Sequence, residues 1–286
     1  MTNKLDFVKV LSTFLVVVFC LLIIIPFWIS IVTSLTTNTS YAIHPVQFIP
    51  KTFTLENYKY LLNNSTILIG YKNTLFIVIV GTVYSLTVSL TMAYGLSQKS
   101  FPGKKFFTLF MIVPMYVTGG VIPIYLQMKN LGLLNNLWGI ILLCGISPFN
   151  MILLKNGIEQ QPYELVEAAK IDGAGELRIF IQIVIPLLKP ILATVALFTV
   201  VTYWNEWFWS TLSLTSANSG TLQSVLRAIV CQNDAMSMTS TMSYASVFQQ
   251  GIKMAAVVVI MLPIMLVYPF VQKYFTKGIM IGAVKM

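Results

Sequence analysis

Residues 167–186 read EAAKIDGAGELRIFIQIVIP, and they place charges, alanines and glycines in the middle of a largely apolar chain. Five of the nine acidic residues lie between Glu159 and Glu176. Pro162 comes just before this stretch and suits the first position of a helix, where a missing N–H is harmless. Gly173 suits the left-handed residue that ends a helix. The stretch therefore predicts a short helix, a glycine turn and a second helix that starts near Glu176.

The rest of the chain has the composition of a membrane protein. Its 286 residues are 57% hydrophobic and 9% charged, whereas a soluble domain carries roughly 25% charged residues. A helix needs about 20 apolar residues to cross a bilayer. Six segments qualify: Leu11–Leu35, Asn73–Leu96, Phe106–Leu126, Leu137–Leu154, Ile183–Leu212 and Ile252–Phe275. The predicted fold class is all-α: a polytopic membrane protein with six transmembrane helices. The helix–turn–helix segment at about residues 159–182 forms an elbow outside the membrane.

The basic residues predict the orientation of the chain. Lysine and arginine are enriched in the cytoplasmic loops of membrane proteins. With six spans, the two termini, the 97–105 loop and the 155–190 segment share one side, which carries twelve of the 18 basic residues. We therefore expect that side, elbow included, to be cytoplasmic. The predicted boundaries are a cytoplasmic N-terminus at 1–10, a transmembrane domain at 11–275 and a cytoplasmic tail at 276–286.

Residues for metal, hydrolytic or nucleotide chemistry are sparse. The chain has one histidine, His44, and three cysteines without metal-ligand spacing. It lacks the G-x-x-x-x-G-K-S/T motif that cradles nucleotide phosphates. The net charge of +9 comes without a basic cluster with interleaved aromatics, so we expect no nucleic-acid partner. We predict no metal site, no catalytic residue and no cofactor on this chain.

The elbow also carries a motif with fixed spacing. The letters EAA stand at 167–169, DG at 172–173 and, after nine intervening residues, IxIP at 183–186. This pattern resembles the EAA loop of the permeases of binding-protein-dependent ABC importers, with Ile185 where leucine is usual. The resemblance implies that the elbow docks in a groove of an ATPase subunit and transmits its motion to the spans. The implied ATPase-coupling residues are Glu167, Ala168, Ala169, Asp172 and Gly173.

Two further stretches narrow the resemblance. The sequence YWNEW at 203–207 and the tail KGIMIGAVK at 277–285 look like those of the maltose-type carbohydrate permeases. Within that family the chain most resembles the second of the two paired permeases, in the branch associated with uptake of complex oligosaccharides. That family implies a bacterial plasma membrane, a homologous sister permease, two ATPase subunits that bind ATP and Mg, and an extracellular solute-binding protein that delivers an oligosaccharide. It also implies that the tail reaches between the ATPase subunits, through Lys277, Gly278, Gly282 and Lys285.

Glu206 is the one acidic residue deep inside a predicted span. A carboxylate in lipid is unfavourable, so it should face the bundle interior or a cavity. At helical spacing Glu206 shares a face with Thr202 and Trp209, and aromatic rings beside hydrogen-bonding groups suit a sugar. An aromatic belt, with Glu206 tying helices together, is the alternative and stays open. The candidate residues of a translocation pathway are Thr202, Tyr203, Asn205, Glu206 and Trp209.

The function predicted from the whole sequence is that of a permease subunit, not an enzyme. It would form half of the translocation pathway of an ABC importer for an oligosaccharide and couple ATPase closure to alternating access. A permease for a non-sugar solute stays open, because the EAA loop alone permits it. An ion-coupled secondary transporter would want intramembrane carboxylates or broken helices in matched halves, and the sequence shows one deep carboxylate and no internal repeat.

Overall fold

The computed structural model shows a helical protein. Within the described residues its regular elements are helices, apart from a single antiparallel bridge between Thr36 and Phe53. This confirms the all-α fold class. The backbone is described for residues 2–216, 219–236 and 248–283, and the side chains for 8–216, 219–231 and 248–266.

Three helices are long and apolar enough to cross a membrane unbroken. They are α1 (Thr2–Ser34), α4 (Ser65–Ser97) and α15 (Gln249–Ala283). The helices α4 and α15 each contain a predicted span and extend beyond it at both ends. The helix α1 covers the first predicted span except its last residue, Leu35, and begins before it. Pro26 and Pro263 lie inside α1 and α15 without ending them.

The other three predicted spans are bent pairs of shorter helices, so the chain has up to six spans if each pair counts as one. The helices α5 (Lys104–Tyr116) and α6 (Val121–Asn130) meet at a bend of 116°. The bend between α7 (Leu137–Cys144) and α8 (Pro148–Glu159) is 49°. The bend between Glu176–Leu187 and α12 (Lys189–Trp204) is 80°.

Local sequence explains where these bends fall. Gly120, the second of two consecutive glycines, is the N-cap of α6. Its φ is 84°, a conformation that residues with a side chain rarely adopt. Pro148 opens α8 at the first helical position, and the Ser147 side chain caps it. Pro190 lies next to the bend at Leu188, where a residue without an N–H cannot continue the hydrogen-bond ladder.

The predicted single span Ile183–Leu212 is wrong in detail. It begins inside a π-helical turn (Phe180–Val184), passes through α11 (Ile185–Leu187) and bends before α12. The helix α12 then ends at Trp204, and a separate short helix, α13 (Phe208–Ser213), follows. Thr202 and Trp209 therefore lie on different helices, and the helical spacing that placed them on one face with Glu206 does not apply.

The chain divides into two compact units, which are described separately. Unit 1 comprises Met1–Ile67 and Leu226–Ile264, and it includes α1 and the short helices α2 (Asn38–Ile43) and α3 (Glu56–Leu62). Asn57 of α3 is buried and donates to the carbonyl of Ser34 at 2.8 Å. This contact ties α3 to the end of α1.

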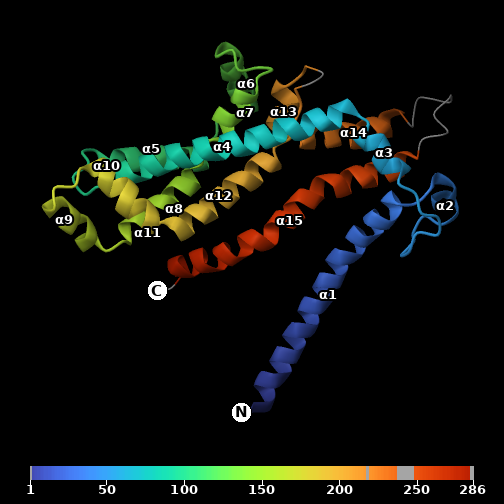
Figure 1. The fold of residues 1–286 in the computed structure, drawn as a ribbon, viewed down its shortest axis with the longest axis horizontal. Coiled ribbons are helices and arrows are strands. Elements are labelled where there is room, and N and C mark those ends of the chain that lie inside the picture. Colours follow the sequence, from blue (N-terminus) through green and yellow to red (C-terminus); the bar gives the residue numbers. More distant parts are fainter. Residues whose placement is uncertain (1, 217–218, 237–247, 284–286) are drawn as a thin grey trace. The chain divides into compact units, whose positions relative to one another are not determined.

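Unit 2, Leu68–Val225 with Met265–Met286, carries the bent pairs and the elbow. The elbow consists of α9 (Tyr163–Ile171), a turn and α10 (Glu176–Ile179). Figure 1 shows α9 at the end of this unit where α10 and α11 lie. The first four residues of α14 (Leu222–Met236) also belong here. The core next to the elbow is formed by Leu90, Ala93, Leu96, Met111, Met151, Leu154, Ile179, Val184, Leu188 and Val195.

Candidate functional site

The helix α9 forms as the local sequence predicts, shifted by one residue. Pro162 occupies the N-cap position instead of the first helical position. Glu164 lies in the first turn and Lys170 in the last, where their charges complement the helix dipole. No residue of α9 is buried, and the Ile171 side chain is 86% exposed. An isolated nine-residue helix is marginal in water, so α9 depends on its anchors for its position.

A Schellman motif ends α9. The Gly173 N–H donates to the carbonyl of Lys170 at 3.1 Å, and the Ala174 N–H donates to that of Ala169 at 2.9 Å. Gly173 has a φ of 78°, which is the left-handed conformation that this motif requires. A Cβ on Gly173 would meet no atom within 4 Å. Because the space around Gly173 is open, the position does not need glycine for its small size. It needs glycine for the left-handed backbone conformation.

The five predicted coupling residues divide between the surface and the interior of the elbow. Glu167, Ala168, Asp172 and Gly173 are exposed. Ala169 is half-buried and packs against the core of unit 2. The four exposed residues form a small surface that leaves room for close approach by another protein.

One carboxylate joins three helices at the base of the elbow. The Tyr94 hydroxyl of α4 donates to Glu176 Oε2 at 2.7 Å, and Lys170 Nζ of α9 lies 2.7 Å from Glu176 Oε1. The hydrogen bond to Glu176 raises the pKa of Lys170. The start of α10 is therefore linked to the end of α9 and to a span 82 residues earlier in the chain. Sequence analysis missed Tyr94 because no local pattern marks a partner so far away.

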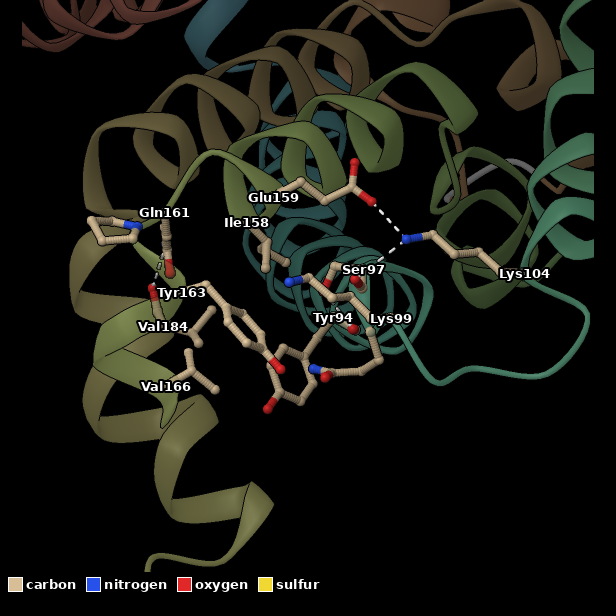
Figure 2. Close-up of a pocket in the computed structure, with 12 residues that line it drawn as sticks. Tyr94, Ser97, Lys99, Lys104, Ile158, Glu159, Gln161, Tyr163, Val166 and Val184 are labelled. Carbon is tan, nitrogen blue, oxygen red and sulfur yellow. Dashed lines mark hydrogen bonds and ion pairs between the residues drawn. The ribbon is translucent and has the colours of Figure 1, made fainter. Parts of the chain in front are cut away.

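A second set of contacts holds the start of α9. Lys99 Nζ lies 3.7 Å from the centre of the Tyr163 ring, a cation–π contact. Lys104 and Lys155 share the Glu159 carboxylate, each at 2.8 Å. Figure 2 shows Lys99, Lys104, Glu159 and Tyr163 around a cavity between the end of α4, the end of α8 and α9, and this cavity has a volume of about 390 Å³. The elbow is thus fastened at both ends to helices of the membrane domain.

Glu206 acts as a cap for a helix. Its Oε1 accepts from the N–H groups of Trp209 and Ser210, at 2.6 Å and 3.1 Å, at the start of α13. Its backbone carbonyl accepts from the Thr221 hydroxyl at 2.9 Å. Glu206 is half-buried, and these bonds give its carboxylate a structural role at the start of α13. The choice between a pathway residue and a tie between helices stays open.

The other candidate pathway residues are not gathered into one site. Thr202 and Asn205 are exposed, and Thr202 Oγ1 donates to the carbonyl of Phe198 within its own helix. Tyr203 is fully buried, and its hydroxyl donates to the carbonyl of Ile141 at 2.8 Å. Trp209 is half-buried and packs on the same core cluster as Tyr203. Their contact with a transported solute stays a prediction.

The predicted contacts of the C-terminal tail fall outside the described side chains. The backbone of Lys277, Gly278 and Gly282 continues α15, which extends to Ala283. Lys285 lies outside the described residues altogether. Among the described residues, no group of three or more His, Cys, Asp or Glu is placed to hold a metal ion.

Comparison with known proteins decides the family. Residues 85–281 match the model of the family described as "Binding-protein-dependent transport system inner membrane component". The chain belongs to this family. This inner membrane component is thus a multi-pass permease of an ABC-type transport system that depends on a solute-binding protein, as the elbow motif led us to expect.

Relatives of this permease cover nearly its whole length. It is 42% identical to Protein LplC of Bacillus subtilis (strain 168) over 92% of this chain and 89% of that one. It is 39% identical to the polygalacturonan/rhamnogalacturonan transport system permease protein YtcP of the same organism, over 93% and 94%. A solved bacterial ABC transporter involved in the import of the acidic polysaccharide alginate contains a chain with 28% identity and a TM-score of 0.87, covering 96% of this permease and 99% of that chain.

Proposed function

We propose that this permease is one of two homologous membrane subunits of an ABC importer for an oligosaccharide. The observation that carries the sugar assignment is the 39% identity to a polygalacturonan/rhamnogalacturonan permease over almost the full length of both chains. The likeness to a chain of an alginate importer supports it. Both named substrates are acidic polysaccharides, so oligosaccharides of uronic acids are the first substrates to test.

In this proposal the elbow is the contact with the ATPase. The exposed residues Glu167, Ala168, Asp172 and Gly173 enter a groove of an ATPase subunit on the cytoplasmic side, where positive charge is enriched. Two ATPase subunits bind ATP and Mg, and their closure displaces α9. The Glu176 and Lys99 contacts then carry the displacement into α4. This is rigid-body switching between two arrangements, and the permease itself performs no covalent chemistry.

The tail and the pathway residues complete the proposal. Lys277, Gly278, Gly282 and Lys285 lie on the same side as the elbow, so that the tail reaches the ATPase pair. The permease contributes half of the wall along which the sugar moves. Of the candidate pathway residues, Thr202 and Asn205 are the ones with exposed side chains, and they are the residues that a passing hydroxyl group would meet.

The experiment that tests this function is a pull-down of the tagged chain from its native membrane in mild detergent, followed by mass spectrometry. We expect a homologous permease and an ATPase with a phosphate-binding loop in stoichiometric amounts. Uptake of labelled uronic-acid oligosaccharides, in cells with and without the gene, then tests the substrate. Strict dependence on a non-sugar solute would select the alternative ABC substrate. A chain that comes alone and moves solute without ATP would overturn the proposal in favour of ion-coupled transport.

A further inference from the structure

The turn between α4 and α5, residues 98–103, is bordered by two cavities of different chemistry. The first has a volume of about 470 Å³ and an almost wholly apolar lining. Four phenylalanines from the turn and α5 line it together with Met92 and Leu96 of α4: Phe101, Phe106, Phe107 and Phe110. Phe106 and Phe107 are 66% and 45% exposed, so the phenylalanine cavity opens to the surroundings of the helices.

The second cavity is the one between α4, α8 and α9 that contains Lys99 and Lys104. Its volume of about 390 Å³ and that of the phenylalanine cavity both lie within the range of about 300–1,000 Å³ typical of ligand sites. The two cavities are lined by consecutive residues: Leu96 belongs to the first and Ser97 to the second, and Lys104 of the second is two residues before Phe106.

Positive charge is in excess in this second cavity. Lys104 and Lys155 share the single carboxylate of Glu159. Lys99 contacts the face of the Tyr163 ring, and no ion pair found among the described residues includes it. Two lysines, Lys99 and Lys104, and one glutamate, Glu159, therefore line the cavity, and Lys155, outside the lining, adds a further positive charge at the same carboxylate. The uncompensated charge attracts an anion, and a basic site at the end of a span is placed for a lipid headgroup.

We propose that the α4–α5 turn binds an anionic phospholipid, with its phosphate at Lys99 and Lys104 and an acyl chain in the phenylalanine cavity. The turn follows Ser97, the last residue of a helix long and apolar enough to span a membrane, so it is placed where the chain leaves the span. A soluble phosphate would use the lysines alone and leave the phenylalanine cavity without an occupant. Because the lysine cavity borders α9, a bound lipid would contact the elbow at Tyr163.

The test is native mass spectrometry of the full-length permease in detergent with added dioleoylphosphatidylglycerol or dioleoylphosphatidylcholine. We expect tighter binding of the anionic lipid. Lys99→Gln should weaken that binding about fivefold, the effect of about 1 kcal/mol for one lysine near an anionic headgroup. It should weaken phosphatidylcholine binding less, because the choline cation offsets the charge of that lipid's phosphate. Lys99→Arg should restore binding of the anionic lipid. Phe107→Ala should weaken the binding of both lipids, because it opens the wall of the acyl-chain cavity.

Matched controls separate this site from general contact with lipid. Lys129→Gln removes an exposed lysine of α6, and Phe19→Ala removes an exposed phenylalanine of α1; neither should change lipid binding. Equal binding of the two lipids, or unchanged binding by Lys99→Gln, would overturn the proposal. Competition by glycerol 3-phosphate at the same concentration would assign the lysines to a soluble phosphate. Loss of lipid from the purified permease pair would assign the cavities to the subunit interface. Either result overturns the lipid assignment.

Discussion

At the scale of single residues, Gly173 and Glu206 show how the backbone defines a role. Gly173 ends α9 with a left-handed conformation and has open space around it. Glu206 offers one oxygen to two N–H groups at the start of α13. Neither role needs reactive chemistry. In both, the residue satisfies a need of the backbone at a helix end: a left-handed conformation at Gly173 and a hydrogen-bond acceptor at Glu206. Different substitutions at the same position should therefore have different effects.

Two substitutions of Gly173 should show whether this position needs a left-handed backbone or the absence of a side chain. Gly173→Val should lose uptake while membrane insertion persists, because a β-branched residue in the left-handed region is destabilised by at least roughly 1 kcal/mol. Asparagine tolerates this region, so Gly173→Asn should retain most of the uptake. Uptake assays with immunodetection of the inserted protein measure both. Loss of uptake in Gly173→Asn as well would show that the partner requires the missing side chain itself.

For Glu206, the cap predicts a difference between an isosteric and a truncated variant. Glu206→Gln keeps an oxygen acceptor for Trp209 and Ser210, so uptake and thermal stability should change little. Glu206→Ala removes the acceptor and should destabilise the protein by about 1 kcal/mol, the typical effect of losing a helix cap. Thermal unfolding in detergent, beside uptake, measures this. If Glu206→Gln abolishes uptake with normal stability, a charge is needed there and the pathway role gains support.

At the scale of helices, unit 2 depends on close contacts that glycine permits. A Cβ on Gly81 of α4 would lie 2.5 Å from the Tyr203 ring, which is fully buried in α12 and held by its bond to Ile141. Gly95 of the same helix would meet nothing within 4 Å. The two glycines thus form a matched pair in one helix, one in contact with a neighbour and one open.

Alanine at these two positions should have opposite effects. Gly81→Ala should destabilise the protein by about 1–3 kcal/mol, because the Tyr203 ring must shift in a packed core. Gly95→Ala should be neutral or stabilising, since alanine favours the helix by about 0.5–1 kcal/mol. Thermal unfolding of the two variants in the same detergent measures the difference. Equal stability of both would contradict the packing of α4 against α12.

The contacts of the elbow with α4 make a further prediction at this scale. Tyr94→Phe removes the hydrogen bond to the Glu176 carboxylate, of a kind that contributes about 1.5–3 kcal/mol when one partner is charged; exposure of this pair reduces that figure. We expect uptake to fall several-fold while the ATPase activity of the assembled importer persists. Tyr60→Phe, at an exposed tyrosine of α3, is the control. A parallel loss of both activities would point to failed assembly and argue against transmission through α4.

At the scale of the whole molecule, the exposed apolar surface and the distribution of basic residues both indicate a protein that spans a membrane. The side chains of α1 are largely exposed, including Phe14 at 62% and Phe19 at 69%, and an apolar surface of this size is stable against lipid or a partner subunit. The basic residues then select one orientation. Family membership establishes the membrane, and the orientation stays a prediction.

Labelling of introduced cysteines tests the orientation. In a variant without Cys20, Cys144 and Cys231, a cysteine at exposed Glu164 in the elbow should react with a membrane-impermeant maleimide only after the cells are opened. A cysteine at Asn135, in the α6–α7 turn, should react in intact cells. Insertion of the cysteine-free parent and its uptake provide the control. Labelling of Glu164→Cys in intact cells would reverse the assignment and remove the elbow from the side where ATP is found.

The sequence by itself determined the features that depend on local signals. Apolar length marked the spans, and proline and glycine marked the ends of α9 almost to the residue, because both restrict the backbone directly. The spaced EAA motif pointed to the family that the comparisons established. These features need no knowledge of what lies nearby in space.

Only the tertiary structure decided which distant residues meet. It bent three predicted spans, ended α12 at Trp204 and made Glu206 a cap for α13. It also brought Tyr94 to Glu176 and Lys99 to Tyr163. The physical reason is that the last two contacts join groups far apart in the chain, and their meeting depends on how the helices pack. A sequence pattern with the period of one helix carries no information about such a contact.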